Sequence, residues 1–167
     1  FWNRYIIYKQ FGIDEFYSVD DFEDAEAIGW SINDESMLMQ SLDKIKAMEE
    51  PFYSHLITLS SHHPFEIPEK YQTLNLEGYT SYSDRHFRNY IHSIHYVDQA
   101  IGKFIDEMKR SGLWDATVVL IYGDHNTGFM DEGNTFAQFS GADNALALQE
   151  GDKSIPLFVH IPAEENS

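Results

Sequence analysis

The chain has 167 residues, of which 43% are hydrophobic and 15% aromatic, which is typical of a folded domain rather than a disordered segment. Its 28 acidic and 11 basic side chains give a formal net charge of −17. That charge argues against a nucleic-acid partner and against an anionic-membrane surface, because both depend on basic patches. The sequence contains no cysteine, which excludes disulfides, thiolate metal sites and a cysteine nucleophile.

The predicted elements begin with an aromatic-rich segment, "FWNRYIIYKQFGIDEFY", which we interpret as loop and short helix. Asn33 or Asp34 is expected to cap a helix that runs to about Met48 and is ended by Pro51. The chain opens on Phe1 and closes shortly after a strand pattern. We therefore expect residues 1–167 to form a single partial domain, truncated at both ends.

The clearest element is a helix from about Asp84 to Ser111, with Ser83 as its N-cap and Gly112 as its stop. Three apolar runs predict strands that are buried on both faces, since polar residues do not alternate with apolar ones. They are Phe52–Ser60, Val118–Tyr122 and Ile155–Ile161. Apolar strands separated by an amphipathic helix predict an α/β fold with a mostly parallel sheet and flanking helices.

Polar residues follow two of these predicted strands, at the sheet edge where α/β proteins place their sites. Asp124 and His125 come directly after one strand, in the stretch "LIYGDHNTGF". An oxygen ligand beside an imidazole suits manganese, zinc or iron better than calcium. A solvated turn explains the same dipeptide equally well, because Gly-Asp is common in turns.

His62 and His63 follow the strand predicted at Phe52–Ser60 and form a second polar cluster. A histidine at such a place can donate a hydrogen bond to a phosphate or transfer a proton, but a polar loop with two solvated histidines is an equal alternative. On the long helix, His92 and His95 have ligand-like spacing but are expected at the surface. Asp98 is expected as a buried structural acceptor.

Trp2 and Arg4 flank Asn3 near the start of the chain. An indole beside a guanidinium could hold a phosphorylated alcohol by stacking and forked hydrogen bonds, although the same residues fit an ordinary aromatic loop. The sequence shows no Ser-His-Asp order, no Walker loop and no dinucleotide-binding fingerprint.

Several motifs in matching order resemble the lipoteichoic acid synthase family, the phosphoglycerol transferases of the sulfatase and alkaline phosphatase superfamily. The motifs are "FWNR", "PFYSHLITLSSHHPF", "YIHSIHYVDQAIGKFIDEMKRSGLWDATVVLIYGDH" and "PLFVHIP". The resemblance implies a partial sulfatase-like domain whose full-length protein moves glycerol phosphate from phosphatidylglycerol to a cell-surface polymer or glycan. It also implies a catalytic domain on the extracellular side of the cell membrane, tethered through an N-terminal region absent from this chain.

The same resemblance assigns residues by motif. Asp124 and His125 match metal ligands for a divalent ion, most often manganese in the family, with magnesium or zinc as the other possibilities. His62 matches a histidine that contacts the substrate phosphate, and Trp2 and Arg4 match the substrate-binding pair of "FWNR". The family's nucleophilic threonine and its glutamate ligand precede "FWNR", so no catalytic nucleophile is assigned here and the chain alone is expected to be inactive.

Two departures from the family pattern leave alternatives open. Ser61 and His63 stand where relatives commonly carry other residues, and "NTGFMDEGN" follows "GDH" in place of a tyrosine-containing loop. A sulfatase or a phosphoethanolamine transferase could use the same site. A non-catalytic domain that binds lipid headgroups or glycans is the alternative of another class.

Overall fold

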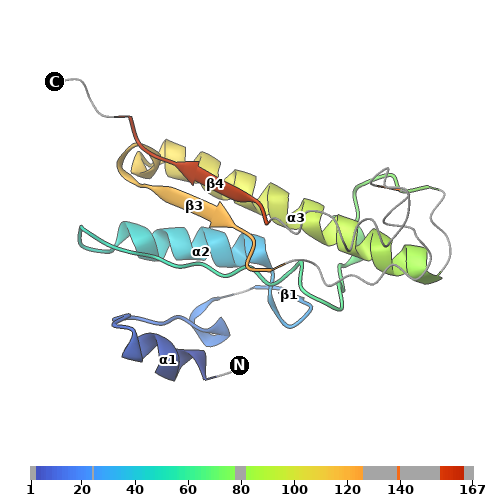
Figure 1. The fold of residues 1–167 in the computed structure, drawn as a ribbon, viewed down its shortest axis with the longest axis horizontal. Coiled ribbons are helices and arrows are strands. Elements are labelled where there is room, and N and C mark those ends of the chain that lie inside the picture. The colour runs from blue at the N-terminus through green and yellow to red at the C-terminus, as the bar shows by residue number, and fades with distance from the viewer. Residues whose placement is uncertain (1–2, 24, 78–81, 126–138, 140–154, 164–167) are drawn as a thin grey trace.

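The structure of the chain is a computed structural model that describes residues 3–23, 25–77, 82–125, 139 and 155–163. The elements are α1 (Arg4–Gln10), η1 (Val19–Asp21), β1 (Ala27–Ile28), β2 (Ser31–Ile32), α2 (Asp34–Lys46), η2 (Glu69–Tyr71), α3 (Tyr82–Arg110), η3 (Leu113–Ala116), β3 (Val119–Tyr122) and β4 (Leu157–His160). Helices α2 and α3 lie side by side, β3 and β4 follow α3, and α1 lies apart from them (Figure 1). No helix in the described ranges is long and apolar enough to cross a membrane.

The long helix α3 confirms the prediction made from the apolar spacing between Asp84 and Ser111. It begins at Tyr82, so Ser83 lies inside the helix and its prediction as the N-cap is wrong. Gly112 follows the helix with a φ of 80°, a left-handed conformation that glycine adopts without steric cost. This glycine lets the chain turn back toward β3.

Helix α2 begins where its cap was predicted. The Asn33 side chain accepts a hydrogen bond from the Ser36 N–H at 2.8 Å, so Asn33 rather than Asp34 is the N-cap. The helix ends at Lys46, two residues before the predicted Met48. A capped first turn fixes the position of Asp34, the first helical residue.

The core lies between α2 and α3, which run in the same direction (Figure 1). Apolar residues from successive turns of the two helices meet there: Leu38, Leu42, Ile45, Ala100, Phe104 and Met108. Phe52 and Leu56 pack against this cluster from the segment that follows α2. A second buried cluster joins β1 and the Phe65–Ile67 region to α3 through Ile28, Ile67, Tyr96 and Val97.

Strands β1 and β2 form a short antiparallel hairpin joined by Gly29 and Trp30. Gly29 has a φ of 60°, which a two-residue hairpin turn with glycine at its first position requires. The turn presents Trp30 outward, with 52% of its surface exposed. The hairpin leads directly into Asn33 and α2.

The prediction of a mostly parallel sheet is wrong for the strands that the structure describes. β3 pairs with β4 antiparallel, with Val119 opposite His160 and Tyr122 opposite Leu157. The segment from Phe52 to Ser60, although extended beside the core, forms no strand. An apolar run indicates where a strand packs but not its direction, so the sequence pattern could not distinguish the two pairings.

The burial expected for these strands is also wrong within the described ranges. Leu120, Tyr122, Leu157, Phe158 and Val159 are all exposed. Val119 is partly buried against the helical core. The described elements therefore cover only part of this strand pair, and none of them buries the apolar side chains of β4.

Around the middle of α3, the buried face differs from the apolar stripe that the sequence predicts. His92 is buried, with 2% exposure, whereas Ile94 and Asp98 are exposed. The surface position predicted for His92 and the buried position predicted for Asp98 are both wrong. A long helix contacts different neighbours along its length, and here its middle packs against the β1 cluster while its C-terminal part packs against α2.

Candidate functional site

The loop that carries His62 is held by two tight turns. The His62 N–H donates to the Leu59 carbonyl oxygen at 3.0 Å, and the Phe65 N–H donates to the His62 carbonyl oxygen at 3.0 Å. Phe65 has a φ of 60°, which is uncommon for a residue with a side chain, and its ring is buried. The loop therefore has a defined shape rather than that of a solvated connection.

A buried carboxylate holds the chain immediately before His62. Asp34 accepts a hydrogen bond from the Leu59 N–H at 2.8 Å and another from the Ser60 N–H at 2.9 Å. In return, the Asp34 N–H donates to the Ser60 hydroxyl at 3.0 Å. Burial raises the pKa of the Asp34 carboxyl, while the hydrogen bonds from Leu59 and Ser60 act in the opposite direction. We call these three hydrogen bonds the Asp34 clamp.

Trp30 contacts His62 directly. The two ring centroids lie 4.6 Å apart with 41° between the ring planes. His62 Nδ1 lies 2.8 Å from the His63 carbonyl oxygen. A carbonyl oxygen only accepts, so Nδ1 carries the proton of this bond and Nε2 is the ring atom that can contact a ligand. If Nε2 also donates to an anion, the imidazole must be protonated.

On the other side of the loop, aromatic rings from α3 pack against His63 and Phe65. The His86 ring centroid lies 5.1 Å from that of Phe65 and 5.7 Å from that of His63. Burial, and secondly the nearby His63, lowers the pKa of His86. Tyr90 also packs edge-on against Phe65. These contacts join the loop to the N-terminal half of α3.

Asp124 and His125 lie at the carboxyl end of β3, as predicted. Asp124 Oδ1 and His125 Nε2 are 3.6 Å apart, and the two side chains are 80% and 65% exposed. Two ligands of one tetrahedral ion, each bound at about 2.1 Å, lie about 3.4 Å from each other. The pair therefore fits two adjacent positions around one divalent ion, and its nitrogen and oxygen donors suit manganese or zinc.

The described residues do not complete a metal centre. In the part of the chain that the structure describes, no group of three or more histidine, aspartate or glutamate side chains gathers closely enough to hold an ion. The role of Asp124 and His125 as metal ligands and their shared site with His62 both stay predictions. Arg4 is the first residue of α1, and Trp2 lies outside the described residues. Their joint role in substrate binding also stays a prediction.

Two features of the His62 loop were missed by reasoning from sequence. Trp30 lies between the elements that are predicted from the sequence, and Asp34 is predicted only as a helix cap. The signal for Trp30 is "IGWS", in which glycine begins a two-residue turn between Ile28 and Ser31. The clamp between Asp34 and Ser60 joins segments 26 residues apart and leaves no local pattern.

The family model for sulfatases matches residues 1–167, and the chain belongs to this family. Curated relatives include the lipoteichoic acid synthase-like YvgJ of Bacillus subtilis, 36% identical over 97% of this chain and 26% of the relative. Lipoteichoic acid synthase 1 of Bacillus subtilis is 32% identical over 99% of this chain and 26% of its own length. Lipoteichoic acid synthase of Staphylococcus aureus is 39% identical over 75% of this chain and 19% of its own length.

Solved structures confirm the fold class. The crystal structure of the lipoteichoic acid synthase LtaP from Listeria monocytogenes matches 98% of this chain and 41% of that chain, with a TM-score of 0.81 and 33% identity. A Vibrio parahaemolyticus protein of the alkaline phosphatase superfamily matches 92% of this chain and 33% of that chain, with a TM-score of 0.61 and 22% identity. The fold is thus a partial α/β sulfatase-like domain. The chain spans about a quarter of the length of the curated relatives.

Proposed function

We propose that this chain is part of a metal-dependent phosphoglycerol transferase, which moves glycerol phosphate from phosphatidylglycerol to a cell-surface polymer or glycan. The observation that supports it most is the His62 loop, which hydrogen bonds hold in one shape. The chain that carries this loop is 33% identical to a lipoteichoic acid synthase of the same fold. We further propose that the catalytic domain lies outside the cell membrane and is tethered to it by a region beyond this chain.

The proposed roles follow from what each side chain can do. His62 donates a hydrogen bond from Nε2 to a phosphate oxygen, while Nδ1 keeps its bond to the His63 carbonyl. Arg4 adds a fixed positive charge, and Trp2 adds a stacking surface for the glycerol phosphate. Because the chain has a net charge of −17, the anionic substrate depends on such local cations.

Asp124 and His125 would hold the divalent ion, for which manganese is the proposed metal. Members of this superfamily generally depend on metal ions. When bound, such an ion offsets the negative charge of a phosphoryl group and lowers the pKa of a bound hydroxyl. The nucleophilic threonine and a further glutamate ligand are proposed to lie outside this chain, so the chain alone should release no diacylglycerol.

The experiment uses the purified full-length protein with manganese and a fluorescent phosphatidylglycerol, and it follows diacylglycerol release. We expect His62→Gln to lower kcat by on the order of 100-fold, because a hydrogen bond to the charged phosphoryl group is lost. His55→Gln removes an exposed histidine from the segment after α2 and is the matched control. Equal turnover by His62→Gln and the control would reject the assigned role.

Parallel assays with other substrates separate the alternatives. Release of diacylglycerol from phosphatidylethanolamine in preference to phosphatidylglycerol would identify a phosphoethanolamine transferase. Release of sulfate from an aryl sulfate ester in preference to both would identify a sulfatase. Binding of phosphatidylglycerol vesicles without turnover of any of the three substrates would identify a headgroup-binding domain.

A further inference from the structure

We propose that Asp34 is a positioning residue for His62, acting through the backbone of Leu59 and Ser60. The inference rests on the proposed function, in which His62 contacts the substrate phosphate. Asp34 itself is 1% exposed and cannot touch a substrate. Its effect on the reaction would therefore pass through the loop that it holds.

The hydrogen bonds of the Asp34 clamp continue directly into the turn that carries His62. Asp34 Oδ1 accepts from the Leu59 N–H, and the carbonyl oxygen of the same Leu59 accepts from the His62 N–H. A displacement of Leu59 therefore moves the acceptor of the bond made by His62. Ser60, also buried, sits between them with both its N–H and its hydroxyl engaged by Asp34.

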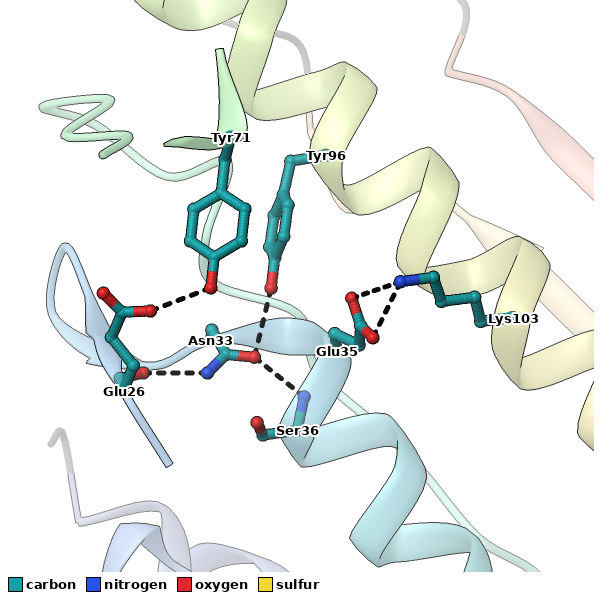
Figure 2. Close-up of polar contacts among 7 residues, drawn as sticks. All are labelled: Glu26, Asn33, Glu35, Ser36, Tyr71, Tyr96 and Lys103. Carbon is teal, nitrogen blue, oxygen red and sulfur yellow. Dashed lines mark hydrogen bonds and ion pairs between the residues drawn. The ribbon is translucent and has the colours of Figure 1, made fainter. Parts of the chain in front are cut away.

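Trp30 supplies a second restraint from the same stretch of chain. Trp30 lies in the hairpin turn, and β2 leads from it through Asn33 to Asp34. The segment thus contacts the loop at two places: the indole packs on the His62 ring, and the carboxylate binds the backbone before it. Asn33 anchors this segment, since its amide donates to the Glu26 carbonyl and accepts from the Tyr96 hydroxyl (Figure 2).

This arrangement bears on phosphate binding because the contact is directional. The bond from Nδ1 to the His63 carbonyl fixes the ring plane, so Nε2 points to one place relative to the loop backbone. A displacement of about 1 Å in a positioned group can cost on the order of 100-fold in rate. Loosening the Asp34 clamp should therefore reduce turnover even though every residue proposed to contact the substrate is unchanged.

The test compares Asp34→Asn and Ser60→Ala in the full-length protein with Ser41→Ala, a matched control. Ser41 is a buried serine on α2 whose hydroxyl contacts Met37 rather than the His62 loop. We expect both clamp variants to lower kcat for diacylglycerol release by about tenfold or more, with KM changing much less. If Asp34→Asn does not fold, Ser60→Ala, which keeps the carboxylate, decides the outcome.

A second readout reports the position of His62 without using activity. With Trp30 labelled as 5-fluorotryptophan, its 19F shift should depend on the His62 ring that packs on it at 4.6 Å. The Trp30→Phe variant identifies the signal, and His62→Gln should move it. We expect Asp34→Asn and Ser60→Ala to move the signal toward its position in His62→Gln and Ser41→Ala to leave it unchanged.

An unchanged 19F shift of Trp30 in folded Asp34→Asn and Ser60→Ala proteins would overturn the inference, whether or not turnover falls. Full turnover in both clamp variants would overturn it as well, provided that His62→Gln is impaired. If His62→Gln retains full turnover, the proposed function fails instead. The 19F shift of Trp30 would then still decide whether Asp34 positions His62.

Discussion

The His160 imidazole stacks on the Trp114 indole, with ring centroids 3.7 Å apart and 16° between the ring planes. His160 Nε2 also lies 2.9 Å from the Trp114 carbonyl oxygen, so the ring donates to the residue on which it stacks. His160 is the last residue of β4, and Trp114 belongs to η3 and packs against the helical core. This pair therefore ties β4 to the core, in addition to the pairing with β3.

Replacing His160 by Ala should lower the free energy of unfolding by about 1 to 2 kcal/mol, because it removes one hydrogen bond and one stacked ring pair. Urea unfolding followed by circular dichroism measures the change. His55→Ala is the control, since His55 is an exposed histidine whose ring meets Tyr8 edge-on. A cost no larger than that of the control would show that β3 alone holds β4.

Asn33 makes three side-chain hydrogen bonds, to Ser36, Tyr96 and Glu26 (Figure 2). Asn33→Ala should lower the free energy of unfolding by about 2 to 3 kcal/mol, because a helix cap and two further bonds are lost at a buried position. Tyr96→Phe removes only one of them and should cost about 1 kcal/mol. Guanidinium unfolding of the three proteins provides the comparison.

The control for Asn33 is an ion pair between the same two helices. Lys103 Nζ lies 2.8 Å from Glu35, and their side chains are 58% and 36% exposed. Lys103→Met should cost about 0.5 kcal/mol or less, because exposed ion pairs contribute little. Equal effects of Asn33→Ala and Lys103→Met would mean that the Asn33 network does not stabilise the fold.

The stability of the protein should fall as the pH is lowered from 7.5 to 5.5. Burial lowers the pKa of His92 below its ordinary value of 6.5, with smaller contributions from the charges of Arg88 and His95. The unfolded chain then binds more protons than the folded one, so the stabilising contribution is present above 6.5 and is lost as the pH falls through the folded-state pKa. Burial also lowers the pKa of His86, so His86 adds to the same dependence of stability on pH.

His92→Gln should reduce this dependence on pH, because glutamine does not titrate. The measurement is the urea midpoint at the two pH values, with His55→Gln as the control for an exposed histidine. A pH dependence that is the same in His92→Gln and in the unmodified protein would contradict the prediction.

Asp124→Ala and His125→Ala should each weaken manganese binding to the full-length protein by at least about 100-fold, since each removes a proposed ligand. Isothermal titration calorimetry measures the affinity independently of turnover. Asp115→Ala removes an exposed aspartate of η3, the element that precedes β3, and should leave the affinity unchanged. Unaltered affinity in the Asp124 and His125 variants would show that this dipeptide forms a solvated turn and does not bind the metal ion.

The sequence predicted the elements whose causes are local. The extent of α3 follows from apolar spacing to within two residues at each end, and Asn33 is among the predicted caps because capping acts over three residues. The direction of β4 and the burial of His92 depend on which elements pack against them, and that information is not local. Trp30 reaches His62 across 32 positions, so neither residue revealed the other in the sequence.

The exposed apolar side chains of β3 and β4 have a consequence for the chain in solution. Phe158 and Val159 belong to a strand whose outer edge is unpaired within the described residues, and such edges favour association with other chains. The net charge of −17 opposes this association by mutual repulsion. Salt screens that repulsion within about 10 Å at 0.1 M, so raising the ionic strength should shift the isolated chain from dispersed molecules toward aggregates.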